Sequence, residues 1–259
     1  MDSQFVLTEM RDRVMWITIN REERRNAMND AVRAGISQAL ERAGNDENVR
    51  AIVLTGAGDR AFCAGADLSA DAKTSEHGSS GSSLLFARLL KQAKEMTLPM
   101  VARINGHCLA GGMGLLAMCD MAVAADHARF GLPEVRVGVF PMQVMSVLQH
   151  LLTPRKLYEL ALTGEPVSAA EAVQIGLVNY VVPGTELDDK VGWLLDRLLD
   201  KSPAAIRRGK DAMRHIESMS FDQALAFLEA QIRIMYTTED AIEGRRAFRE
   251  KRPPIWTGR

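Results

Sequence analysis

The sequence has few cysteines and no pattern that would make them a disulfide framework or a metal centre. Its three cysteines, Cys63, Cys108 and Cys119, are odd in number, lie in apolar surroundings and show no CxxC spacing. Thiols of this kind are typical of proteins kept in a reducing compartment. The sequence therefore argues against a disulfide scaffold, indicates no metal site and favours a cytoplasmic protein.

The chain also lacks an excess of charge of one sign and a long apolar run. Lys plus Arg total 32 and Asp plus Glu total 33, so the formal net charge is −1, which offers no general attraction to nucleic acid or to an anionic membrane. No stretch is apolar for the roughly 20 residues that a transmembrane helix needs, and the polar N-terminus lacks the apolar segment of a signal peptide. We expect a soluble protein with no nucleic-acid partner and no membrane partner.

What the 259 residues do contain is enough apolar side chains, 47%, to bury a large core. Strand patterns are followed by helical patterns in the first half of the chain, and helices dominate from Gln143 onward. This alternation predicts an α/β fold, as one large domain or one domain with an appendage. Strands are predicted at 5–9, 14–20, 51–54, 101–104, 121–125, 129–132 and 177–182. Helices are predicted from Asp30 to about Ala43, at 84–98, 144–152, 154–162, 168–176, 187–199, 221–235 and 239–251, and from Pro203.

Two stretches place small residues shortly after a predicted strand. The strand ending at Ile104 leads into Ala110–Gly112 and a buried helix, and the strand ending at Leu54 leads into Ala64–Asp67. Small residues leave the backbone bare, so its N–H groups can approach a ligand, and a helix N-terminus adds partial positive charge. Two such bends can present one N–H each to a shared oxygen, as in an oxyanion hole. Tight strand-to-helix packing without a ligand is the alternative interpretation.

A third segment carries a carboxylate in a constrained position. Glu134 follows Pro133, which restricts the local backbone. We expect the carboxylate to be buried among Val139, Phe140 and Met142, where desolvation would raise its pKa and allow proton exchange near neutral pH. Most glutamates beside a proline are simply solvated, which is the alternative.

These three segments together resemble the crotonase (enoyl-CoA hydratase/isomerase) superfamily, and the resemblance extends from Ile17 to Pro253. It implies a spiral of ββα units, with residues 1–195 as an α/β core that carries an acyl-CoA site. Residues 196–259 would be a C-terminal helical region for oligomerisation and contact with coenzyme A. The implied partners are an acyl-CoA substrate and further copies of the chain, as a trimer or a dimer of trimers. No cofactor is expected beyond the coenzyme A of the substrate.

The resemblance also implies roles for single residues. The backbone N–H groups of Ala66 and Gly111 match the two oxyanion donors, and Glu134 matches the acid/base residue. Substrate contacts are implied at Arg24, Arg25, Ala27, Ala64, Asp67, Leu68, Gly114, Pro133, Met142, Phe248 and Lys251. Without the resemblance, the arginines would be assigned to a solvated loop, and the basic C-terminal segment to a helix end stabilised by its own dipole.

One departure from the family pattern leaves the reaction open. Typical hydratases of this family carry a second glutamate three residues after the oxyanion glycine, and here that position is Gly114. A single acid/base residue suits a proton shuttle between carbons, as in Δ3,Δ2-enoyl-CoA isomerases. Hydration with a water held by another group, a decarboxylase or related enolate chemistry, and a non-catalytic acyl-CoA-binding protein remain alternatives.

Two further features have competing interpretations. The low-complexity stretch 69–83 is expected to be a flexible lid beside the acyl pocket or a plain surface linker. Gln143 is expected at a helix start, where it would orient a water or a substrate carbonyl, or else have an ordinary surface role. The apolar stripe of the helix 221–235 would suit trimer assembly, although a contact within the chain explains it equally well.

Overall fold

The computed structural model describes residues 4–67 and 79–259. Within this part of the chain the main sheet has six strands in the order β1-β2-β3-β5-β7-β10, and β1 alone runs antiparallel to its neighbour. The strands are β1 (Val6–Arg11), β2 (Val14–Ile19), β3 (Ala51–Gly56), β5 (Met100–Ile104), β7 (Met121–Ala125) and β10 (Tyr180–Val182).

A smaller sheet lies against the main one in the order β4-β6-β8-β9. Its strands are β4 (Ala61–Cys63), β6 (His107–Leu109), β8 (Arg129–Gly131) and β9 (Val167–Ser168). Each of β4, β6 and β8 directly follows a strand of the main sheet. Helix α3 (Ser79–Glu95) comes after β4, and α4 (Gly111–Ala117) comes after β6. The repeated strand, strand, helix order confirms the predicted α/β spiral of ββα units.

The main sheet is covered on both faces, so its strands are apolar on both sides. Successive residues of β3 point to opposite faces: Ile52 and Leu54 join the larger apolar core, and Ala51 and Val53 join the smaller one. Helices α1 (Asp30–Asn45) and α3 close the larger core, and α8 (Leu187–Leu199) closes the smaller one. The sheet is therefore a rigid middle layer that carries the small sheet and its bends.

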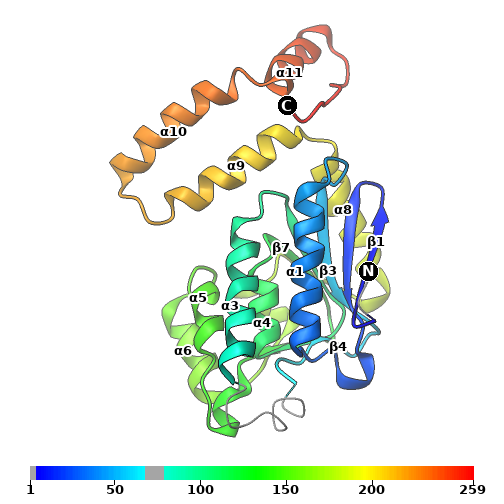
Figure 1. Ribbon diagram of the computed structural model, residues 1–259, viewed down its shortest axis with the longest axis vertical. Coiled ribbons are helices and arrows are strands. Elements are labelled where there is room, and N and C mark those ends of the chain that lie inside the picture. The colour runs from blue at the N-terminus through cyan, green and yellow to red at the C-terminus, as the bar shows by residue number, and fades with distance from the viewer. Residues whose placement is uncertain (1–3, 68–78) are drawn as a thin grey trace.

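Short helices complete the lower half of the molecule in Figure 1. They are α5 (Met142–Leu148), α6 (Pro154–Thr163), α7 (Ala169–Gln174) and the 3-10 turns η1 (Glu22–Arg24), η2 (Pro133–Val137) and η3 (Gly184–Glu186). Local signals explain their ends: Pro154 begins α6, Gly164 ends it in the left-handed region, and the Ser168 hydroxyl accepts from the Glu171 N–H at the start of α7.

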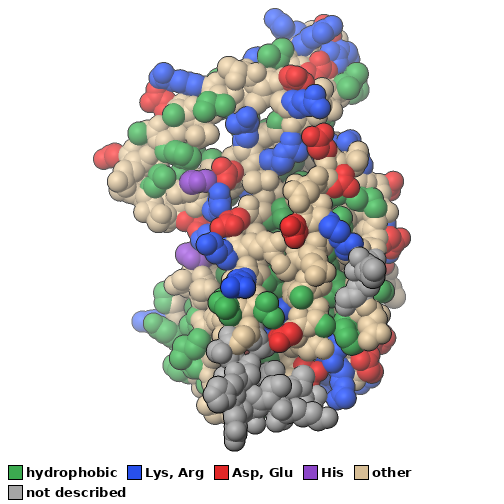
Figure 2. Space-filling model, in the orientation of Figure 1, with side chains coloured by type: hydrophobic (Ala, Val, Ile, Leu, Met, Phe, Trp, Pro, Cys, Tyr) green, Lys and Arg blue, Asp and Glu red, His purple; other side chains and the backbone are tan. Residues whose placement is uncertain are grey.

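Three C-terminal helices form an arm that projects from the rest of the chain (Figure 1). They are α9 (Pro203–Ile216), α10 (Phe221–Met235) and α11 (Glu239–Glu250), capped at their starts by Ser202, Ser220 and Thr238. No residue of α10 is buried, and apolar side chains such as Phe221 and Leu225 are exposed on it. Figure 2 shows this apolar surface on the arm.

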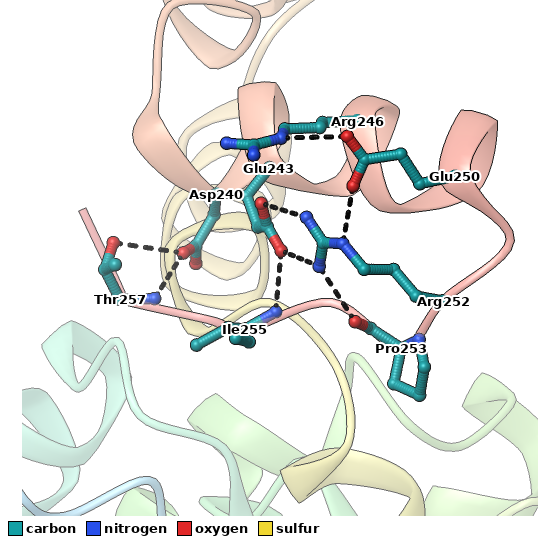
Figure 3. A network of polar contacts seen from close by, with 8 residues as sticks. All are labelled: Asp240, Glu243, Arg246, Glu250, Arg252, Pro253, Ile255 and Thr257. Atoms are coloured by element: carbon teal, nitrogen blue, oxygen red, sulfur yellow. Dashed lines mark hydrogen bonds and ion pairs between the residues drawn. The ribbon is translucent and has the colours of Figure 1, made fainter.

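Polar contacts fold the C-terminal tail back onto the arm (Figure 3). The Asp240 carboxylate accepts hydrogen bonds from the N–H groups of Thr257 and Gly258 and from the hydroxyl of Ser202. The two oxygens of Glu243 pair with the guanidinium of Arg252 at 2.6 and 3.0 Å. The arm thus has its own internal order even though much of its apolar surface is uncovered.

Most predicted elements are confirmed, some with their ends, such as 187–199 and 221–235. Three of those that differ are as follows. Helix α3 begins at Ser79 rather than at 84, so the last residues of the low-complexity stretch are helical, and the remainder up to 78 lies outside the described residues. Strand β10 spans only 180–182, and α5 ends at Leu148.

The predicted boundary between residues 195 and 196 falls inside α8. Leu194 and Leu195 pack into the smaller core on the main sheet, so the whole helix belongs to the α/β part of the chain. The arm begins at Pro203 instead. No helix in the described part of the chain is long and apolar enough to cross a membrane.

Candidate functional site

The first bend, 64–67, is held like a strand beside the loop 25–28. The N–H of Met28 donates to the carbonyl of Gly65 at 2.7 Å, and the N–H of Asp67 donates to the carbonyl of Met28 at 2.9 Å. In this parallel pairing the N–H of Ala66 points away from Met28. It has no hydrogen-bond partner among the described residues, and Ala66 is exposed.

The second bend, 109–112, joins β6 to α4 through a strained residue. Ala110 has φ 52° and ψ −124°, a conformation that L residues rarely adopt, and its N–H donates to the carbonyl of Gly131 at 2.9 Å. The turn leaves the N–H of Gly111 without a partner in the described part of the chain. Strain of this kind persists where the surrounding structure enforces it, commonly at functional sites.

The two bends touch one another. Gly65 has φ 102°, and a Cβ atom there would lie 2.6 Å from the Cβ of Ala110 and 3.4 Å from the nitrogen of Gly111. A Cβ on Gly111 would in turn lie 3.9 Å from the nitrogen of Ala66 and 2.7 Å from the Cε of Met28. Glycine is therefore required at position 65, whereas a Cβ atom at position 111 would displace only the flexible end of the Met28 side chain. Two N–H groups without a partner in the described part of the chain therefore lie at adjoining bends, and their role as an oxyanion hole stays a prediction.

Glu134 lies in η2, which begins at Pro133 and follows β8. Its Oε2 atom is buried and has no hydrogen-bond partner among the described residues. Burial raises the pKa of this carboxyl, and a hydrogen bond to backbone only partly opposes that rise. Of the apolar residues predicted around it, Val139 and Met142 are 56% and 73% exposed, so these two side chains are not buried as that prediction implied.

Gly114 lies on α4 one helical turn beyond Gly111, and an aromatic ring occupies the space beside it. A Cβ atom on Gly114 would lie 2.9 Å from the Cζ of Phe86 and 3.4 Å from the Cγ2 of Val144. Phe86 is buried and belongs to the larger apolar core. The apolar side chains of Phe86 and Val144 therefore line the space beside Gly114, which a side chain at position 114 would occupy.

The arginine-rich loop divides into exposed and buried parts. Arg25, with φ 52°, lines an open cavity of about 440 Å³ together with Asp59, Arg60, His107 and His127. Arg24 is exposed in η1, and Ala27 is half-buried. Arginine side chains in such a cavity suit the recognition of phosphate groups.

Asp67 is placed differently from the prediction. Its carboxylate is 8% exposed and lies 2.8 Å from the Nη2 of Arg21, which is itself 9% exposed. The side chain is therefore committed to a buried ion pair and does not face a ligand, and a substrate contact through the backbone of Asp67 stays a prediction. Leu68 lies outside the described residues, so its predicted contact stays a prediction.

Sequence reasoning missed Arg21 and Asn26. Asn26 is fully buried, and its amide donates to the carbonyls of Ala57 and Ala61 at 3.0 and 2.7 Å. Both residues looked like members of a solvated charged loop. The only signal in the sequence was an asparagine directly after a charged run, a residue type that tolerates positive φ, as it does here at 55°.

Three further predicted residues have other surroundings within one chain. The amide of Gln143 donates to the carbonyl and hydroxyl of Ser83, so it ties α5 to α3 and does not orient a ligand. Phe248 is 86% exposed on α11, and Lys251 ends that helix in the left-handed region. Figure 1 shows α11 at the far end of the molecule from β4 and α4.

The three thiols are buried, as their apolar surroundings predicted. Burial raises the pKa of Cys63 to about 12, so it is protonated and unreactive at neutral pH. Among the described residues, no group of three or more His, Cys, Asp or Glu side chains is placed to hold a metal ion.

Comparison with known proteins gives one consistent result. The family model described as enoyl-CoA hydratase/isomerase matches residues 9–259. A probable enoyl-CoA hydratase of Mycobacterium bovis is 35% identical, with 100% of both chains covered, and a carnitinyl-CoA dehydratase of Proteus mirabilis is 32% identical, with 99% of this chain and 100% of that protein covered. The crystal structure of an enoyl-CoA hydratase from Bacillus anthracis matches with a TM-score of 0.95 at 30% identity, covering 99% of this chain and 100% of that one. Carrying the two adjoining bends and the Glu134 segment on this spiral fold, the chain belongs to the enoyl-CoA hydratase/isomerase family of enzymes, the crotonases.

Proposed function

We propose that the protein acts on acyl-CoA thioesters by stabilising a thioester enolate. The thioester oxygen would lie between the N–H groups of Ala66 and Gly111, and Glu134 would carry the proton. The observation that supports this most directly is the pair of unpartnered N–H groups at two bends in contact.

The chemistry requires such donors because removing the α-proton moves negative charge onto the thioester oxygen. A fixed donor is worth about 3 kcal/mol when it meets charge that develops in the transition state. Main-chain donors at these bends need no reorganisation, because Gly65 and Ala110 hold the backbone by direct contact.

Glu134 has the properties of a proton carrier. Its buried, unpartnered Oε2 and its raised pKa make it a better base than a solvated carboxylate and also allow it to hold the proton before returning it. Its segment is tied to the second bend, because the carbonyl of Gly131 accepts from the N–H of Ala110. The proton would thus be moved beside the oxygen that takes the charge.

The reaction is narrowed by the wall at Gly114. A glutamate at this position could hold a water for addition, but here the residue is glycine and the ring of Phe86 lies beside it. This favours proton transfer between carbons, as in a Δ3,Δ2-enoyl-CoA isomerase, over ordinary hydration. Hydration with a water held elsewhere, other enolate chemistry and non-catalytic binding remain the competing proposals.

Coenzyme A would enter only as part of the substrate, with no further cofactor. Arg24, Arg25, Ala27, Ala64 and Pro133 are proposed to lie along it. Phe248 and Lys251 would reach it from a neighbouring copy, because within one chain α11 lies far from the bends. The uncovered apolar surface of α10 supports assembly as a trimer or a dimer of trimers.

The test is incubation with a panel of 2-enoyl and 3-enoyl CoA thioesters in deuterated water, followed by mass spectrometry. Bond migration with deuterium uptake is the expected result for a 3-enoyl thioester. Water addition would show that another group holds a water. A protein that binds the thioesters but never exchanges the α-proton would be a binder, and the enolate proposal would be wrong.

A further inference from the structure

The guanidinium of Arg21 bridges the two backbone segments that hold Ala66. Its Nη1 donates to the carbonyl of Ala27 at 2.6 Å, and its Nη2 donates to the carboxylate of Asp67 at 2.8 Å. Ala27 directly precedes Met28, whose N–H and carbonyl bond on either side of Ala66. The guanidinium of Arg21 therefore links the segment 27–28 to the segment 66–67, and the pairing of these two segments sets the direction of the Ala66 N–H.

Arg21 is itself held firmly in this place. Its N–H donates to the side chain of Asn26 at 3.0 Å, and its carbonyl accepts from the N–H groups of Arg24 and Asn26 at 2.9 Å each. The guanidinium also lies 5.4 Å from the ring of Phe5. A side chain fixed at this many points can transmit position to its partners.

Arg21 has a second effect, because its positive charge balances the negative charge of Asp67. Asp67 directly follows Ala66 and its carboxylate is buried, so its negative charge is weakly screened by solvent and Arg21 is the cation that pairs with it. Negative charge beside a developing enolate opposes its formation. Arg21 balances that charge while leaving the backbone of Asp67 to hold the bend.

Stability alone accounts poorly for the pair. A buried ion pair is often no more stabilising than apolar side chains of similar volume. The Nε atom of Arg21 is also buried with no hydrogen-bond partner among the described residues, which is a cost to folding.

We infer that Arg21 is a positioning residue for the oxyanion hole: it aims the Ala66 N–H and neutralises Asp67 next to it. The inference rests on the proposed function, since it assigns Arg21 a part in the same enolate chemistry. It separates the buried Arg21 from the exposed Arg24 and Arg25 of the same loop, which would only bind coenzyme A.

The test compares Arg21→Met, Arg21→Lys, Asp67→Asn and the double variant Arg21→Met/Asp67→Asn. Arg21→Met should slow α-proton exchange about a hundredfold while KM stays within about threefold, because a misaimed donor acts mainly in the transition state. The double variant should exchange at least about tenfold faster than Arg21→Met, because the unbalanced charge is gone. Arg21→Lys should lie between the unaltered protein and Arg21→Met.

A spectroscopic readout isolates the oxyanion hole from folding. Acetoacetyl-CoA has an enolate form that absorbs in the near ultraviolet, and the unaltered protein should stabilise that form on binding. Arg21→Met should lose this absorption yet bind the saturated thioester butyryl-CoA as before. Arg50 supplies the matched control, since it is a buried arginine at the other end of β3 that donates to the carbonyl of Lys201. Arg50→Met should lower the melting temperature without changing the enolate absorption.

The outcomes separate two failures. If the unaltered protein exchanges protons and Arg21→Met exchanges them equally well, Arg21 is merely structural and the inference is wrong. If Arg21→Met does not fold, Asp67→Asn and Arg21→Lys decide by the same comparison of enolate absorption with melting temperature. If the unaltered protein neither exchanges protons nor stabilises the enolate of any thioester, the proposed function fails and takes this inference with it.

Discussion

Around Ala66, its neighbours Ala64, Gly65 and Asp67 are hydrogen-bonded to residues from a distant part of the chain, whereas on α10 no residue is buried. The bend has a backbone partner in Met28, an ion pair at Asp67 and a close approach of Gly65 to Ala110. The arm holds itself together through polar contacts at its end and leaves Phe221 and Leu225 exposed. One chain therefore brings together the residues of the proposed chemistry, whereas its C-terminal apolar surface would be covered only in the proposed assembly.

The largest expected effect is in the core. Replacing Glu134 by Gln removes the proton carrier, and α-proton exchange should fall by a factor of about 10² to 10⁴. Thioester affinity should be nearly unchanged, because the backbone donors remain. The measurement is deuterium uptake, with Glu229→Gln on the exposed face of the arm as the control. Equal losses in the two variants would contradict the division between core and arm.

Gly111→Val tests the second bend. The new side chain would meet Met28 at 2.7 Å and would lie beside the nitrogen of Ala66, where the thioester must approach. Turnover should fall by about 10²-fold or more, a much larger effect than the loss of stability. Gly192→Val on α8 is the control, because nothing lies within 4 Å of a Cβ atom there. Retained activity in Gly111→Val would place the oxyanion hole elsewhere.

Leu225→Asp tests the arm. If its apolar face is covered by another copy, a charge there should convert a trimer or hexamer to smaller species in light scattering at micromolar concentration. Affinity for coenzyme A thioesters should weaken, since Phe248 and Lys251 could no longer reach a neighbour's site. The far-ultraviolet circular dichroism should persist. A protein that is monomeric before substitution would refute the assembly proposal.

Gly114→Glu tests the apolar wall. The ring of Phe86 lies where the new Cβ would stand, so the variant should lose about 1–3 kcal/mol of stability and gain little hydration of crotonyl-CoA. Phe86→Ala in the same chain should relieve the clash and permit a larger gain in water addition. Thermal melts and hydration assays of the two single variants and the double variant give the comparison. Hydration by the unaltered protein at rates usual for enzymes would overturn the single-glutamate argument.

The smallest expected effect is on the pH dependence of stability, which should differ between Glu134 in the core and Glu243 in the arm. Burial raises the pKa of Glu134 above 4.5, so protonation of this carboxyl stabilises the folded protein. That stabilisation is present below pH 4.5 and is lost as the pH rises through the raised pKa. The hydrogen bonds from Arg252 lower the pKa of Glu243 to about 2, so the ionised Glu243 carboxylate stabilises the folded protein above pH 4.5. That stabilisation is lost as the pH falls toward 2. Glu134→Gln should therefore raise the melting temperature at pH 7, and Glu243→Gln should lower it. Both differences should shrink in acid, and changes of the same sign would show that the two environments are alike.

Much of the fold followed from local pattern. Alternating and buried apolar runs predicted the strands of the main sheet, and Ser168 and Pro203 marked helix starts that the structure confirms. These signals are local, because a cap or a period of apolar residues acts over a few positions. The two small-residue bends and Glu134 were also visible from residue type and order.

What the sequence by itself determined was therefore the α/β spiral, the family and the candidate bends. Tertiary structure alone decided which side chains lie beside them, since Arg21 and Asp67 are 46 positions apart and only folding pairs them. It also decided that Phe86 fills the space at Gly114 and that α8 belongs to the core. Burial, ion pairing and close contact depend on atoms brought together from distant segments, and no local pattern records which segments will meet.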